Sequence, residues 1–244
     1  MVNKNTSRLS FSRVRLWFAI AAVLLLVVVV ALNPLRSSAA SNSDFTQTIN
    51  AGTLVTDIRD NTGASVANPS VAFGAVSAAF SCLTGGARPQ ATFGTNTERI
   101  YVDNPNDVTQ WDLTLAAASN TDVWENGGAT ATYDYNDPDA GGDCTDGVTD
   151  ADGVAGQLFV DPTVGTVTAD CTGGFCGTTG VTEGSTAATY AEGTVDDITL
   201  MQADNTSDPF GRWYITGIDM RQSIPAGQAA DNYTINLVLT VAGS

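Results

Sequence analysis

The sequence predicts an all-β protein, with an antiparallel β-sandwich and Greek-key-like connections as its architecture. Two runs far apart in the chain, residues 110–115 and residues 233–241, alternate apolar and polar side chains as half-buried strands do. Glycine is frequent, Ala, Thr and Val dominate, and no long helical periodicity follows residue 40. Because two distant strands with one apolar face each need a shared core, we expect the rest of the chain to complete two layers.

The two runs each gather large side chains on one face. Trp111 and Leu113 lie on one side of the first run, and Tyr233, Leu237 and Leu239 lie on one side of the second. We expect these five side chains to be structural, because burying large apolar groups stabilises a fold. Stacking of the tryptophan on a sugar ring is the alternative.

Further short strands are predicted between these runs, separated by turns that contain Gly, Asn and Pro. The alternation across residues 71–80 slips by one near Gly74, which indicates a bulge within a strand. A hairpin is predicted over residues 156–169. The other expected strands are residues 54–58, 90–93, 98–102, 129–133, 195–200 and 212–219.

Residues 1–40 have the organisation of a secretory signal. A basic segment precedes the unbroken apolar run of residues 16–32, and Pro34 and small residues follow it. We expect a signal helix and cleavage after Ala40, which would place the protein outside the cell or at its surface. The alternative is an uncleaved anchor, since 17 apolar residues are near the minimum for a span; contact with the membrane would then involve residues 16–32 alone.

Residues 41–244 are expected to form a single secreted domain with a strongly acidic charge. They contain five Arg against 26 acidic residues, a net charge of −21, and no Lys or His. The electrostatic field of this net negative charge repels nucleic acid and anionic lipid, which excludes both as partners. Without His there is no Ser-His-Asp or Cys-His catalysis and no histidine-bound zinc, so we expect neither an enzyme nor a resident cofactor. A glycoside hydrolase with paired carboxylates is the alternative.

Residues 116–190 differ in composition from the rest, because Gly, Asp, Thr and Asn dominate. We interpret this stretch as an inserted hairpin region, since it has too few large apolar residues to hold a core of its own. Trp124 lies beside a glycine-rich loop in it and is a candidate exposed binding residue, in contrast to the buried role expected for Trp111.

The acidic part of this region offers a candidate calcium site. Carboxylates at short spacing between glycine turns suit Ca²⁺, which takes six to eight oxygen ligands on a bending loop. A solvated acidic loop is the alternative. The candidate ligands are Asp143, Asp146, Asp150 and Asp152.

The four cysteines, Cys82, Cys144, Cys171 and Cys176, all lie in the part expected to be exported. An even number of cysteines in an oxidising compartment predicts two disulfides. Three pairings are open. A bond between Cys171 and Cys176 would close a small loop, whereas Cys144 with Cys171 would fix the base of a hairpin.

Several short motifs occur around the predicted strands in a fixed order. They are Val71-Ala72-Phe73-Gly74, Val102-Asp103-Asn104, Trp111-Asp112-Leu113, Ile224-Pro225-Ala226-Gly227 and residues 233–239. In this order they resemble the WxL family of bacterial cell-surface domains. That family has a second W-x-L in its closing strand, where this chain has Leu237-Val238-Leu239. The resemblance implies a secreted β-sandwich that associates non-covalently with the cell wall or with neighbouring surface proteins.

The stretch just after the signal carries a second, weaker similarity. Asp44-Phe45-Thr46, followed by residues 50–54, is similar to camelysin-type exported fibre proteins. The expected function is therefore that of a non-catalytic surface protein that binds wall polymer or neighbouring proteins through its loops. The alternative is a homo-oligomeric structural subunit of a filament or layer, in which residues 41–56 complete a neighbour's sheet.

Overall fold

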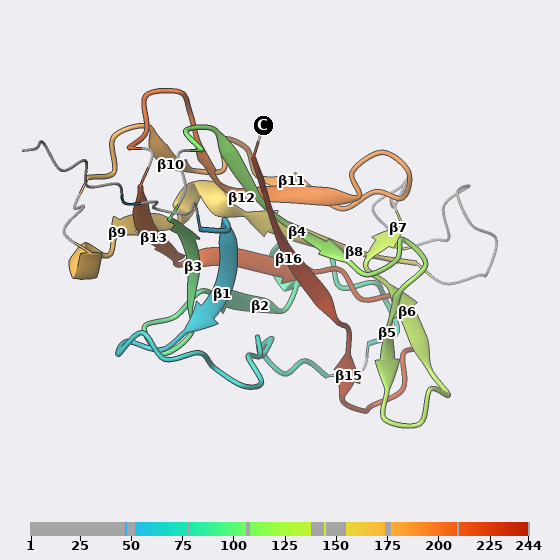
Figure 1. Ribbon diagram of the computed structural model, residues 1–244. Helices are drawn as coiled ribbons and strands as arrows, with labels where there is room; N and C mark the ends of the chain where they lie inside the picture. Colours follow the sequence, from blue (N-terminus) through green and yellow to red (C-terminus); the bar gives the residue numbers. More distant parts are fainter. Residues whose placement is uncertain are drawn as a thin grey trace, which may run out of the picture. The chain divides into compact units, whose positions relative to one another are not determined.

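The computed structural model of the chain describes a strand-rich unit (Figure 1). Contacts divide the chain into two units, Met1–Ile49 and Asn50–Ser244, and every described strand lies in the second. The predicted signal helix lies outside the described residues, among which no helix is long and apolar enough to cross a membrane. The described residues are 47, 52–77, 79–105, 108–137, 144, 155–173, 177–208 and 210–243.

The described strands form four antiparallel sheets, which confirms the predicted all-β class. In order across the first sheet, they are β1 (Val55–Arg59), β3 (Arg99–Asn104), β13 (Gly211–Thr216) and β9 (Thr166–Ala169). The second sheet consists of β10 (Val181–Glu183), β12 (Asp197–Ala203), β4 (Trp111–Ala117) and β16 (Leu237–Gly243).

The remaining strands form two further sheets. The third consists of β11 (Ala188–Thr189), β8 (Gly156–Asp161), β14 (Ile218–Gln222) and β2 (Gln90–Phe93), with β7 (Asn136–Asp137) also paired to β8. The fourth consists of β15 (Tyr233–Thr234), β5 (Val123–Asn126) and β6 (Thr132–Asp134). Single 3-10 turns are η1 (Gly85–Ala87), η2 (Pro162–Val164) and η3 (Cys171–Gly173).

The first and third sheets are joined at a corner that three chain segments cross. β2 continues into β3 through Gly94, β13 continues into β14 through Gly217, and β8 continues into β9 through η2. Gly94 and Gly217 have φ angles of 77° and 84°, in the left-handed region that favours glycine, and the amide of Gly217 donates to the carbonyl of Gly94 at 2.8 Å. A Cβ on Gly94 would lie 2.9 Å from the carbonyl oxygen of Ile215, so the close approach requires glycine.

The buried core contains side chains from all four sheets. Along β4, Trp111, Leu113 and Leu115 are buried and alternate with half-buried residues. Trp213 and Ile215 of β13 are also buried, and the ring centroids of the two tryptophans lie 5.7 Å apart. The two sheets therefore pack through these side chains.

The two runs that predicted the fold are neighbours in the second sheet. β4 pairs with β16 in the register that joins Trp111 to Gly243 and Ala117 to Leu237. Leu237 and Leu239 are half-buried and alternate with exposed residues, as predicted. Tyr233, however, lies in β15, which pairs with β5, so the closing run is divided between two sheets.

The structure corrects two of the predicted elements. The described part of residues 71–80 contains no strand, and Phe80 is fully exposed, because alternation alone does not supply a ladder partner. The hairpin predicted over residues 156–169 is wrong: β8 pairs with β14 and β9 pairs with β13, and Leu158 is fully buried. These strands need no core of their own because they share the core of the sheets they join.

Candidate functional site

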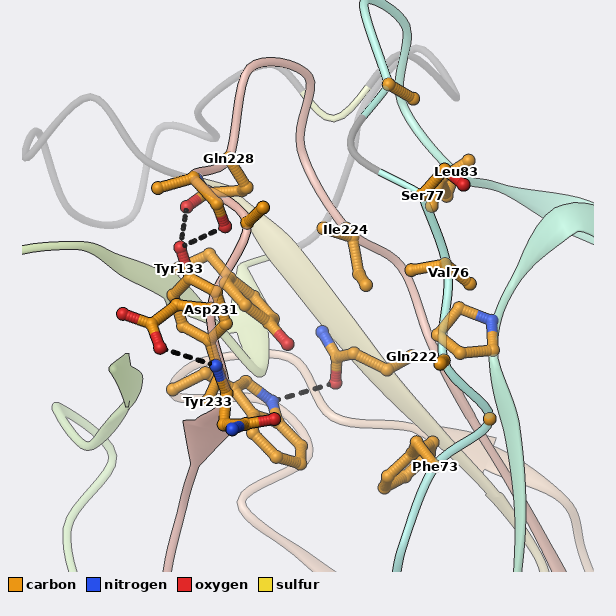
Figure 2. A pocket seen from close by; sticks show the side chains of 18 of the residues that line it. Phe73, Val76, Ser77, Leu83, Tyr133, Gln222, Ile224, Gln228, Asp231 and Tyr233 are labelled. Atoms are coloured by element: carbon orange, nitrogen blue, oxygen red, sulfur yellow. Dashed lines mark hydrogen bonds between the residues drawn. The ribbon is translucent and has the colours of Figure 1, made fainter. Parts of the chain in front are cut away.

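A groove runs between residues 69–77 on one side and residues 228–239 on the other. It consists of two adjoining hollows, the first of about 460 Å³ and the second of about 620 Å³. Four residues line both hollows, which makes them continuous: Val71, Phe73, Trp124 and Tyr233. Figure 2 shows the first hollow, with Tyr133 and Tyr233 on one side, Phe73 and Val76 on the other and Gln222 between them.

Aromatic rings in contact form part of the groove's lining. The ring of Phe73 meets Trp124 edge-on, with centroids 5.6 Å apart, and Trp124 stacks on Tyr133 at 5.9 Å. Tyr133 in turn contacts Tyr233 at 5.0 Å. The four rings come from an irregular segment and from β5, β6 and β15, so the cluster exists only when the fourth sheet is assembled beside residues 69–77.

Gln222, at the end of β14, fixes the indole within this cluster. The Nε1–H of Trp124 donates to Oε1 of Gln222 at 3.0 Å, in a buried hydrogen bond that Figure 2 draws as a dashed line. The Nε2 of Gln222 donates to the carbonyl oxygens of Asp134 and Ser223 at 3.0 and 2.7 Å. Because the amide donates and accepts in this buried network, it holds the indole in one orientation.

The predicted binding residue Trp124 is therefore not exposed on a loop. It lies in β5 with 8% of its surface exposed. Its burial follows from the pairing of β5 with both β6 and β15, which brings Tyr133 and Tyr233 against it. The residue still lines both hollows, so it contributes to the groove from within the wall.

Part of the lining of the second hollow is apolar and belongs to the core. It consists of buried Phe93, Leu115, Leu158 and Met220, which come from β2, β4, β8 and β14. The open part of this hollow is lined by exposed Val238 and half-buried Val71 and Phe73, whose remaining apolar surface a ligand or partner can bury with a gain in free energy.

The rim of the first hollow is polar. Asp231 accepts a hydrogen bond from Asn126 at 3.1 Å, and the hydroxyl of Tyr233 donates to the carbonyl of Ala229 at 3.0 Å. Burial, with the neighbouring Tyr233, raises the pKa of Tyr133, and burial together with Asp231 raises the pKa of Tyr233. Both phenols are therefore neutral at physiological pH and available as hydrogen-bonding groups.

Runs of consecutive residues border much of the groove. Val71–Ser77 line the first hollow and Tyr233–Leu239 line the second, although successive side chains of an extended chain point to opposite sides. β16 is an edge strand of the second sheet. Among the described residues, the backbone of Val71–Ser77 makes one hydrogen bond to the rest of the fold, from the amide of Gly74 to the carbonyl of Gln90 at 3.0 Å.

An ion-pair network covers the outer face of the first sheet and fixes β1 beside the groove. Arg59 bridges Asp57 at 3.0 Å and Asp103 at 2.7 Å. Arg212 contacts the same Asp103 at 2.6 Å and Asp170 at 3.6 Å. β1, β3 and β13 are thereby linked by side chains as well as by their ladders.

The disulfide pairing left open by the sequence is partly resolved. Cys82 and Cys144 are bonded, with their Cα atoms 5.6 Å apart, which rules out the bond between Cys144 and Cys171. Cys171 is also disulfide-bonded, and Cys176 lies outside the described residues. Cys82 precedes Leu83, which lines the first hollow and bridges to Ile224, so this bond stabilises the end of the groove wall.

The candidate calcium ligands Asp143, Asp146, Asp150 and Asp152 lie outside the described residues. Within the part that the structure describes, no group of three or more His, Cys, Asp or Glu side chains is placed to hold a metal ion. Sequence reasoning missed Gln222 altogether, because a glutamine at the end of a strand has no local signal of a buried partner. No protein-family model, curated protein or solved structure matches this chain.

Proposed function

We propose that the chain is an exported, non-catalytic bacterial cell-surface protein with a WxL-like β-sandwich, which binds wall polymer or neighbouring surface proteins non-covalently. The signal-like N-terminus supports export, and the packing of the first and second sheets through Trp111 and Trp213 supports the two-layer architecture. The groove is the proposed binding site. The observation that carries this proposal is the groove's exposed apolar lining.

Two exposed valines show where a partner would gain most from contact. Val76 is 44% exposed and lines the first hollow, and Val238 is 45% exposed and lines the second. Large apolar side chains left this exposed mark interaction surfaces when they gather at one place. Val164, 57% exposed on η2, does not line the groove and serves as a matched control.

Retention on isolated cell walls tests this proposal. We expect the unmodified protein to be retained. Val76→Asp and Val238→Asp should each reduce retention at least about tenfold, because each puts a charge into an apolar contact. The control Val164→Asp should be retained like the unmodified protein. Walls stripped of protein distinguish a polymer from a protein partner. No retention on either kind of wall, or equal losses for all three variants, would overturn the proposal.

A structural subunit that assembles by strand exchange is the second candidate. The observations that favour it are the position of β16 at the edge of the second sheet and the single hydrogen bond that the backbone of Val71–Ser77 makes among the described residues. An extended chain adds readily to an exposed edge because its main chain completes the ladder. Filaments seen by electron microscopy, and lost when the donor residues are deleted, would support this candidate over wall binding.

A further inference from the structure

We infer that the groove accepts an extended strand, and that residues 41–51 of a second copy of this chain supply it. This inference rests on the proposed function of the groove as a binding site and names its occupant.

The length and lining of the groove suit a single strand. The first hollow is lined by Val71–Ser77 and Gln228–Tyr233, and the second by residues 69–71, Phe73 and Tyr233–Leu239. Residues 69–77, which run along both hollows, correspond to roughly 30 Å of extended chain at about 3.3 Å per residue. An inserted strand could bond to the outer edge of β16 and turn alternate side chains toward Leu115, Leu158 and Met220 in the core. Its backbone would then be satisfied while its apolar face is buried.

Residues 41–51 have the sequence that this environment requires. Phe45, Gln47 and Ile49 fall on one face, and Thr46 and Thr48 fall on the other. Asp44 is the one charged residue in the segment, so insertion brings little uncompensated charge beside the apolar floor.

The structure narrows the segment that can be donated. Val55 and Thr56 already pair with Asp103 and Val102 within their own sheet, so inserting them into a neighbour's groove would break this ladder. The amide of Gly52 bonds to the carbonyl of Pro105 at 3.4 Å, which fixes the chain where β1 approaches. The donor therefore ends before this point. If cleavage occurs after Ala40, an eleven-residue tail, residues 41–51, remains.

A complementation experiment with the full chain, expressed and exported with its own N-terminal segment, tests the inference. Ile49→Asp disables the donor and leaves the groove intact, whereas Val238→Asp disables the groove and leaves the donor intact. We expect each variant alone to lose the oligomers of the unmodified protein by size-exclusion chromatography with light scattering. An equimolar mixture should form dimers, because one functional donor then meets one functional groove.

Matched controls separate strand insertion from a general loss of solubility or folding. Thr48→Asp changes the opposite face of the donor, and Val164→Asp changes an exposed valine outside the groove; both should assemble as the unmodified protein does. Far-ultraviolet circular dichroism checks that every variant is folded, and Val76→Asp replaces Val238→Asp if the latter is not.

Several results would overturn the inference. These are a monomeric unmodified protein, unchanged assembly of Ile49→Asp, and a mixture that stays monomeric. Wall retention of the same variants separates this failure from failure of the proposed function. Loss of retention for Val238→Asp with full retention for Ile49→Asp would keep the groove as a binding site and reject residues 41–51 as its occupant.

Discussion

The protein buries tryptophans in two regions that differ in how completely they are closed. Between the first and second sheets, Trp111 is fully buried against Trp213, and its Nε1 has no acceptor among the described residues. Beside the groove, Trp124 retains a small exposed surface, and its Nε1 donates to Gln222. In the first region the indole is packed on all sides and its Nε1–H makes no hydrogen bond among the described residues. In the second region the indole lines an open groove and its Nε1–H is hydrogen-bonded.

This difference indicates separate roles for the two regions. A side chain closed on every side contributes its transfer free energy to folding alone. A cluster that is held in place by hydrogen bonds and left open at one side can offer part of that free energy to a partner. Substitutions should therefore separate loss of stability from loss of binding, and the expected effects run from the closed core to the exposed surface.

The largest effect is expected in the closed core. Trp111→Ala should lower the free energy of unfolding by about 3–5 kcal/mol, because it removes a fully buried indole and leaves a cavity. Urea denaturation followed by circular dichroism measures it. Trp124→Ala is the comparison and should cost less stability while lowering partner retention. Equal losses of stability in the two variants would remove the distinction between the regions.

The disulfide next to the groove wall should have the second largest effect. Cys82 and Cys144 are separated by 62 residues, so their bond restricts a long loop in the unfolded chain. Replacing both with Ser should cost about 2–4 kcal/mol on denaturation in urea. Groove binding should weaken as well, because Leu83 and its bridge to Ile224 follow directly. Unchanged binding by the folded variant would show that the wall does not depend on this bond.

A smaller effect is expected at the amide that orients the indole. Gln222→Met keeps the length of the side chain but leaves the Nε1 of Trp124 without its acceptor, at a cost of about 1–3 kcal/mol. The exposed Gln90 is a matched control, and Gln90→Met should change stability by less than about 0.5 kcal/mol. Thermal or urea unfolding of the pair measures the difference, and similar values for both would argue against a buried network.

The smallest effect concerns pH and the outer face of the first sheet. Burial raises the pKa of Asp170, but hydrogen bonds from Thr172 and the charge of Arg212 lower it by more, so it lies below the ordinary value of 3.8. A lowered pKa in the folded state adds stability above that ordinary value, and this stability is lost as pH falls through the folded pKa. The free energy of unfolding should therefore decrease below about pH 4, by at most about 1 kcal/mol for a pair this accessible.

Arg212→Met provides the check on this pH dependence. Without the guanidinium, Asp170 should titrate closer to its ordinary value, so the decrease between pH 7 and pH 3 should be shallower than in the unmodified protein. Denaturation in urea at several pH values measures both slopes. A steeper decrease in the variant would contradict the assignment of this ion pair.

The local pattern of the chain determined which residues face inward in its clearest strands. Alternation placed Trp111 and Leu113 on the buried face of β4 and Leu239 on the inner side of β16, because a strand turns successive side chains to opposite sides whatever its partner. The same rule wrongly predicted a strand over residues 71–80. There the side chains alternate, yet the described backbone has no ladder partner.

Tertiary structure alone decided the groove and the place of β8 and β9. Phe73, Trp124, Gln222 and Tyr233 come from segments separated by up to 160 residues, and no local period records that they meet. Residues 116–190 have few large apolar residues, but Leu158 of β8 is buried because neighbouring strands supply the rest of the core. Periodicity indicates the face of a strand on which a residue lies. A groove forms where distant segments lie near each other without pairing as strands, and local periodicity holds no information on that arrangement.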